Sequence, residues 1–228
     1  MRFLRQTASI AAKDLRSELR TKDSLNAAGS FALVIIVLFS FMLDPTETQT
    51  VYELSGGLLW LVFAFAGALI LNRSFARELP NDCLDMLVAS PVSSSALFLG
   101  KATANFTLLL VVELVCLPVF GGMYNLSRWS THLGPLLGVV VLGTWGVTVI
   151  GTMFSAITVN LRLRELMLPI LVYPIMIPCL MAAMKLSTVL ISGEAITGDD
   201  WIWLRLLIGF DIIFTSLSLL TVDFVLVS

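Results

Sequence analysis

Six apolar runs, each about as long as a lipid bilayer is thick, decide what this chain can fold into. A membrane-spanning helix needs ~20 apolar residues, and lipid offers no partner for an open backbone N–H or C=O. Runs of this kind are therefore predicted to be helices. They cover residues 25–43, 51–71, 102–123, 134–156, 166–184 and 206–226. We predict an all-α integral membrane protein with six transmembrane helices in a single domain, residues 1–228.

The composition agrees with a membrane protein and excludes other classes. Hydrophobic residues make up 57% of the chain and charged residues 13%, against about 25% charged in soluble proteins. The net charge is −2 and the chain has no basic tract, so we expect no nucleic-acid partner. The three cysteines lack the spacing of a metal site or a disulfide framework, and we expect reduced thiols.

Residues 1–22 are predicted to form an amphipathic helix that lies in the membrane interface. One stripe is apolar: Leu4, Ala8, Ala11, Leu15 and Leu19. The opposite stripe is polar and mostly basic: Arg2, Arg5, Ser9, Lys13, Arg16 and Arg20.

The basic residues predict the orientation of the spans. Eleven of the fourteen lie in residues 1–22, 72–101 and 157–165, and the remaining three (Arg128, Lys185 and Arg205) fall on the other side. Because basic residues gather on the cytoplasmic side, both termini are predicted to be cytoplasmic.

Two of the spans have an unusual composition. The fourth contains a GxxxG at Gly134 and Gly138 and a threonine row, and we interpret it as a packing helix. The fifth contains Pro169, Pro174 and Pro178, which predict a kinked or broken helix.

The loop of residues 72–101 contains a predicted short helix, residues 81–89. Asp82 and Asp85 lie in its first turn, where carboxylates favour the helix dipole, and Pro91 ends it. Leu84, Leu87 and Val88 make one apolar stripe. Such a helix either docks into a groove of a partner or lies on lipid headgroups.

Enzymatic signals are weak. The Gly100-Lys101 pair lacks the earlier glycine and the following Ser or Thr of a phosphate-binding loop, so we expect no nucleotide site and no enzyme activity in this chain. His132 is the only histidine, and we expect neither a metal site nor a haem ligand. Inside the spans, Glu113 and Asp211 either pair within the bundle or mark a proton or substrate pathway.

The loop pattern resembles the cytoplasmic loop of the haem exporter B (CcmB) family. The pattern is Arg73-x-Phe75-x-x-Glu78, then Leu84-Asp85-x-Leu87-x-x-x-Pro91, then Lys101. Gly57-x-x-Trp60 and the proline-rich fifth span are similar to the same family. Asp82 and Asp85 depart from its usual glycine and glutamate.

The resemblance implies a permease subunit of ABC-2-type exporter architecture for cytochrome c maturation, located in the bacterial cytoplasmic (inner) membrane. It implies a homodimer, with the ATPase CcmA, the haem-handling protein CcmC, the small subunit CcmD and the haem chaperone CcmE as partners. ATP with Mg would be bound by the ATPase, and haem would be handled by the complex. Residues 81–89 would be the coupling helix, with Glu78, Asp82, Leu84, Asp85, Leu87, Val88 and Pro91 as coupling residues. Two alternatives are an ABC-2-type permease for a lipid, drug or polysaccharide, and a scaffold that transports nothing.

Overall fold

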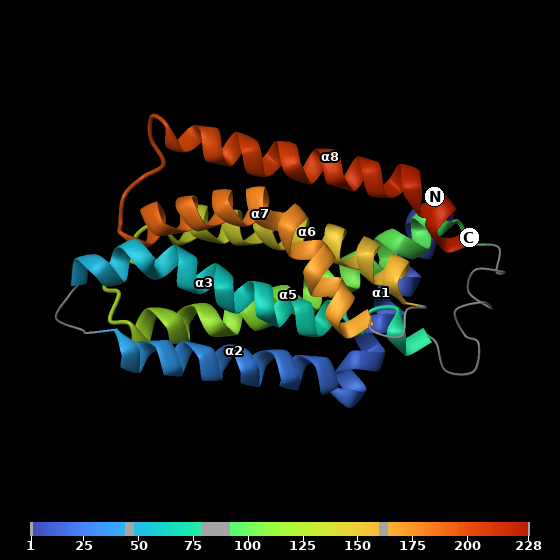
Figure 1. The fold of residues 1–228 in the computed structure, drawn as a ribbon, viewed down its shortest axis with the longest axis horizontal. Coiled ribbons are helices and arrows are strands. Elements are labelled where there is room, and N and C mark those ends of the chain that lie inside the picture. The colour runs from blue at the N-terminus through green and yellow to red at the C-terminus, as the bar shows by residue number, and fades with distance from the viewer. Residues whose placement is uncertain (1, 44–47, 79–91, 160–163, 228) are drawn as a thin grey trace.

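The computed structural model describes residues 2–43, 48–78, 92–159 and 164–227, and the regular elements in these residues are all helical (Figure 1). Six of the helices are long and apolar enough to cross a membrane, which confirms the predicted six-span helical fold. The elements are α1 (Arg2–Thr21), α2 (Asp23–Met42), α3 (Thr48–Leu71), the 3-10 helix η1 (Ala76–Glu78), α5 (Ser94–Met123), α6 (Leu133–Thr158), α7 (Arg164–Ile191) and α8 (Asp200–Val227).

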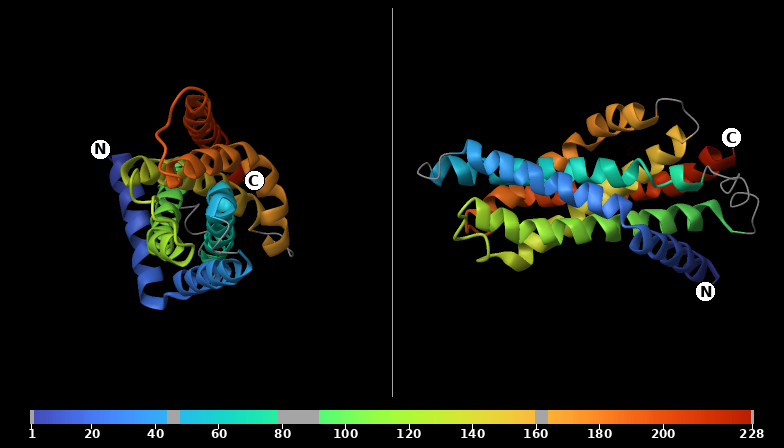
Figure 2. Two further views of the ribbon diagram at one scale, coloured as in Figure 1. Left: turned by 90° about the vertical axis from the view of Figure 1, so that its left-hand side faces the viewer. Right: turned by 90° about the horizontal axis from the view of Figure 1, so that it is seen from below.

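The six long helices run side by side along the long axis of the molecule (Figures 1 and 2). One end of the bundle carries α1, η1 and the C-terminal end of α8. The turns from α5 to α6 and from α7 to α8 lie at the opposite end (Figure 1). Both chain termini therefore lie at the end that carries α1 and η1.

The centre of the bundle is α6, which packs against α3, α5, α7 and α8. Three glycines allow this close packing: a side chain at Gly143 would meet the Trp60 ring, one at Gly146 would meet Asp211 and Cys179, and one at Gly151 would meet Leu71. The predicted packing role of α6 is thus seen in the structure, but through other glycines. Gly134 and Gly138, which form the GxxxG, have open space where a Cβ would lie.

The outer helices expose their apolar side chains. Phe41 and Met42 of α2 and Leu220 and Phe224 of α8 are each more than 70% exposed. Apolar surface of this extent on a chain with six spanning helices faces lipid or another protein.

The helix α1 leaves the bundle at an angle (Figure 2) and packs along the first turns of α5. At the crossing, Gly100 lies against Ile10 and the Thr7 carbonyl, where a Cβ would find no room. On α1, Ala11 and Glu18 are buried, whereas Leu4 and Leu19 of the predicted apolar stripe are exposed.

The junction between α1 and α2 is a single residue. Lys22 has a left-handed conformation (φ 59°, ψ 14°), which few residues other than glycine adopt. Glu18 Oε1 accepts hydrogen bonds from the backbone N–H groups of Ser24 (2.7 Å) and Leu25 (3.0 Å). The last turn of α1 thereby caps the first turn of α2.

Three helices extend well beyond the predicted spans. α8 begins at Asp200, six residues before the predicted start at residue 206. α5 begins at Ser94, within the stretch predicted as a loop, because the Ser93 side chain accepts a hydrogen bond from the Ala96 N–H and caps it. α7 continues to Ile191, past the predicted end at residue 184. α7 also contains the three prolines and bends away from the bundle in its N-terminal half (Figure 1), as predicted for a proline-kinked helix.

Candidate functional site

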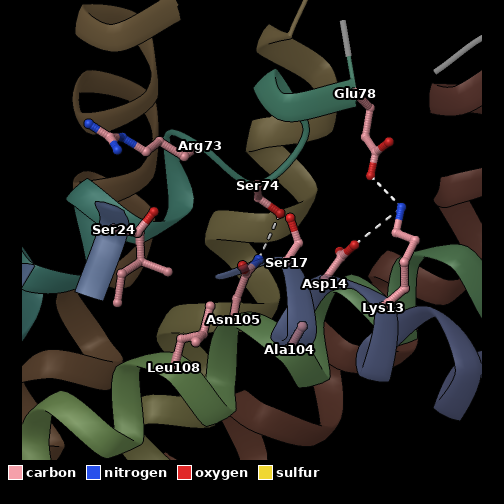
Figure 3. Close-up of a pocket in the computed structure, with 11 residues that line it drawn as sticks. Lys13, Asp14, Ser17, Ser24, Arg73, Ser74, Glu78, Ala104, Asn105 and Leu108 are labelled. Atoms are coloured by element: carbon pink, nitrogen blue, oxygen red, sulfur yellow. Dashed lines mark hydrogen bonds and ion pairs between the residues drawn. The ribbon is translucent and has the colours of Figure 1, made fainter. Parts of the chain in front are cut away.

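Three chain segments meet where the chain turns after α3. η1 places Glu78 beside Lys13 of α1 (Figure 3). Glu78 also lies beside Lys101 of α5. Glu78 Oε1 accepts hydrogen bonds from Lys13 Nζ at 2.7 Å and from Lys101 Nζ at 3.1 Å. Asp14 completes the group, 3.3 Å from Lys13 Nζ and 3.2 Å from Lys101 Nζ. We call these four residues the ion cluster.

The key member of the ion cluster is Lys101, whose side chain is only 1% exposed. An ammonium has three N–H donors, and here all three find acceptors: Asp14 Oδ2, Glu78 Oε1 and the Ser74 carbonyl at 3.1 Å. Lys101 Nζ also lies 4.9 Å from the centre of the buried Phe75 ring, a favourable cation–π distance. The charge is thus fully satisfied where water hardly reaches.

The ion cluster contains two cations and two anions and is neutral as a whole. Burial alone would raise the pKa of Glu78, but Lys101 and Lys13 outweigh it and the pKa lies below its ordinary value. Burial alone would lower the pKa of Lys13, but Glu78 and Asp14 raise it. Each charge is therefore stabilised by the others, which ties α1 to α5 and to the end of α3.

The first part of the family-like pattern and its last residue, Lys101, converge here, although 28 positions separate Arg73 from Lys101. Glu78 and Lys101 form the ion pair, Phe75 supplies the ring, and Arg73 lines the adjoining pocket. This pocket of about 250 Å³ lies between α1, α5 and the α3 end, and we call it the interfacial pocket. It is lined by Lys13, Asp14, Ser17, Ser24, Ile70, Arg73, Ser74, Glu78, Ala104, Asn105 and Leu108 (Figure 3).

Most of the predicted coupling residues lie outside the residues that the structure describes. These are Asp82, Leu84, Asp85, Leu87, Val88 and Pro91. Glu78 is described, and its side chain turns to the two lysines rather than away from the bundle. The coupling helix at residues 81–89 stays a prediction, and one member of the ion cluster, Glu78, comes three residues before it in the chain.

Glu113 lies inside the bundle and is 1% exposed. Its Oε2 is 2.5 Å from the Thr144 hydroxyl, which is also 2.6 Å from the Val140 carbonyl. A hydroxyl has one proton and cannot donate to both oxygens. A neutral Glu113 carboxyl supplies the second proton, so this geometry suits the uncharged acid.

Asp211 of α8 is 7% exposed and lies against Gly146 and Cys179. Both of its carboxyl oxygens are buried without a hydrogen-bond partner among the described residues. Glu113 and Asp211 contact α6 at positions two residues apart, which point in different directions on a helix. The structure therefore does not join them into one site.

The described residues contain neither the ligand group of a metal site nor paired cysteines. Across the described ranges, no three His, Cys, Asp or Glu side chains are grouped as a metal site would require. Cys116 and Cys179 are free and buried.

The sequence indicated Glu78 and Lys101 only as members of a pattern and did not indicate the ion cluster. One signal was available: Lys101 stands at the edge of an apolar run, where a lysine needs either water or a carboxylate. The partners could not be predicted, because they are far apart in the sequence. Lys13 is 65 positions from Glu78, and Asp14 is 87 positions from Lys101.

Comparison with known proteins identifies the family of this chain. The family model described as CcmB protein matches residues 5–225. A protein named heme exporter protein B from Paracoccus denitrificans is 30% identical over 172 residues, 74% of this chain and 76% of that protein. Proteins of the same name from Rhodobacter capsulatus (28% identical; 78% and 80% covered) and Escherichia coli K12 (28% identical; 67% and 68% covered) are also similar. With nearly its whole length matched, this chain belongs to the CcmB family.

Proposed function

We propose that this chain is the membrane permease subunit of an ABC transporter complex for cytochrome c maturation. In this complex a separate ATPase subunit drives haem export or the release of a haem-loaded chaperone. The observation that carries the proposal is the family match over residues 5–225, together with relatives named heme exporter protein B. The six spanning helices supply the membrane part that such a subunit needs.

The partners follow from the same proposal. The ATPase CcmA binds ATP with Mg and carries out the hydrolysis, so this chain is not itself an enzyme. The haem-handling protein CcmC, the small subunit CcmD and the chaperone CcmE complete the complex, with two copies of this chain. This chain holds no cofactor of its own, and a stoichiometric haem absorption band from the purified chain would contradict that.

The ion cluster favours a mechanical role for the α3–α5 connection. Glu78, the last described residue before residues 79–91, is bound to α1 and α5 through two lysines. A push on a helix at residues 81–89 would therefore reach two helices at once. This is what a coupling element between an ATPase and a membrane bundle requires.

The decisive experiment is co-purification of the ATPase with a Leu84→Glu/Leu87→Glu permease. Burying a leucine side chain stabilises a contact by roughly 1.5–3 kcal/mol, so losing two weakens it about a hundredfold or more. The matched control is Met86→Glu/Ala89→Glu, which adds the same charge to the opposite face of the predicted helix. Equal retention of the ATPase by both variants, with normal cytochrome c, would place the coupling element elsewhere.

Orientation is tested by labelling. We propose that the protein lies in the bacterial inner membrane with both termini in the cytoplasm, because eleven of fourteen basic residues lie in the N-terminal segment and the two loops assigned to that side. In a variant without native cysteines, an impermeant thiol reagent added outside should label Ser130→Cys and not Ser90→Cys. Labelling at position 90 in intact cells contradicts the orientation.

The two alternatives give different results. A permease for a lipid, drug or polysaccharide would leave cytochrome c unaffected when the gene is deleted. A scaffold would support cytochrome c maturation even with an ATPase-dead CcmA in an intact complex, whereas a working transporter subunit would not.

A further inference from the structure

The interfacial pocket has both polar and apolar walls. Ile70 of α3 and Ala104 and Leu108 of α5 supply the apolar part, and hydroxyl and charged groups supply the rest. Its volume, about 250 Å³, equals that of roughly eight water molecules in the liquid. A pocket with these walls suits a ligand that is polar at one end and apolar at the other.

The position of the pocket matches the level of lipid headgroups. α1 forms one wall, and its outer surface exposes Leu4 and Leu19 beside basic residues, as helices in the membrane interface do. α3 and α5, which form the other walls, are spanning helices. The pocket therefore opens where a spanning bundle meets an interfacial helix.

Arg73 gives the pocket its charge. The other charged lining residues, Lys13, Asp14 and Glu78, belong with Lys101 to the neutral ion cluster. The carboxylate of Glu18, next to the pocket residue Ser24, accepts hydrogen bonds from the backbone N–H groups of Ser24 and Leu25 at the start of α2. The Arg73 guanidinium is exposed and has neither an ion pair nor a hydrogen bond within the described residues.

Two hydroxyl groups add donors. Ser74 Oγ accepts a hydrogen bond from Asn105 Nδ2 at 2.8 Å, and its own proton has no acceptor among the described residues. The same holds for the Ser17 hydroxyl on α1. Figure 3 shows Arg73 and Ser24 to one side of these serines and the Lys13–Glu78 pair to the other. The Arg73 guanidinium points away from the serines, and turning this exposed side chain brings it to a phosphate bound beside them.

We propose that the interfacial pocket binds the phosphate group of an anionic phospholipid. The phosphate accepts from Arg73, Ser17 and Ser74, and the lipid's glycerol and chain carbons contact Ile70, Ala104 and Leu108. A guanidinium with flanking hydroxyls is a strong donor set for phosphate oxygens. The bound lipid thereby bridges α1 and α5 beside the ion cluster. This inference does not rest on the proposed transport function.

The test uses the full-length chain, with any subunits that co-purify, in a neutral detergent. Phosphatidylglycerol is added, and its apparent affinity is measured from the rise in unfolding temperature. Diacylglycerol with the same chains, which lacks the phosphate, and inorganic phosphate, which lacks the chains, are the comparison ligands. We expect stabilisation by phosphatidylglycerol alone. An equal effect of diacylglycerol, or of inorganic phosphate, overturns the assignment.

Three variants locate the site. Arg73→Gln should weaken phosphatidylglycerol binding about fivefold, the value of one cationic side chain at a lipid surface. Ser17→Leu, at an exposed position, keeps every charge but fills the pocket, and it should abolish phosphatidylglycerol binding. Unchanged binding by Ser17→Leu would overturn the site, and this variant carries the test if Arg73→Gln does not fold. Arg16→Gln removes a neighbouring exposed charge outside the pocket. A loss with Arg16→Gln as large as with Arg73→Gln would show non-specific attraction and refute the site.

Discussion

Replacing Lys101 with methionine should destabilise the protein more than replacing any other lysine of the chain. Methionine has a similar length and flexibility, so the change removes the charge and the three donors with little loss of volume. The Ser74 carbonyl then loses a partner, and Asp14 and Glu78 share Lys13 alone.

The expected loss is about 3 kcal/mol in the free energy of unfolding. Removing one partner of a buried ion pair costs about 3–5 kcal/mol, and the lower end applies here because Asp14 and Glu78 are 18% and 13% exposed. The measurement is unfolding of the purified chain in mixed micelles titrated with sodium dodecyl sulfate. Lys185→Met, an exposed lysine on α7, is the control and should change stability by less than about 0.5 kcal/mol.

A double variant separates the loss of the ion pair from the change in side-chain volume. Lys101→Met/Glu78→Met removes one charge of each sign and leaves Lys13 paired with Asp14. Its cost should be clearly smaller than the sum of the two single changes. If the costs simply add, or if Lys101→Met behaves like Lys185→Met, then the ion cluster is effectively solvated and the reasoning is wrong.

Three further changes test other parts of the structure. The contact of α1 with α5 should be firmest between about pH 4.5 and 10.5. The contribution of Glu78, whose pKa is lowered, is lost as the pH falls through that folded-state pKa, and that of Lys13, whose pKa is raised, is lost as the pH rises through its own. Hydrogen exchange of residues 2–21 measures this, and Glu78→Gln should remove the acid limb. Gly143→Val should cost at least ~1–3 kcal/mol because its side chain would overlap the Trp60 ring, whereas Gly138→Val should be nearly neutral in a thermal unfolding assay. Glu113→Gln should preserve assembly and cytochrome c maturation because the amide can still donate and accept, and Glu113→Leu should be worse; loss of maturation by the glutamine variant in a normally assembled complex would instead indicate a titrating role.

The spans were predictable because their cause is local. Length and apolar composition specify a helix in lipid without knowledge of any neighbour. The same measure misses helix that extends beyond an apolar run. Residues 94–101 include three polar positions at the start of α5, so a hydropathy limit begins at Ala102, while the Ser93 cap begins the helix at Ser94.

Contacts between helices were less predictable. The GxxxG of α6 is the recognised close-packing motif, yet the glycines that meet a neighbour are those opposite Trp60, Asp211 and Leu71. Which face of α6 is covered depends on the four helices packed against it. The ion cluster shows the same limit, since Lys101 is marked by its sequence position but its burial depends on α1.

The one-residue junction at Lys22 makes α1 a lever. A helix rises ~1.5 Å per residue, so Lys13 lies about 14 Å and Arg2 about 30 Å from the junction. A 10° tilt about Lys22 would move Lys13 by about 2.4 Å and the far end of α1 by about 5 Å. The first displacement is nearly as large as the 2.7 Å that separates Lys13 Nζ from Glu78 Oε1. A tilt of α1 about Lys22 by this amount would separate Lys13 from Glu78 if both side chains kept their conformations, and the closed ion cluster opposes such a tilt.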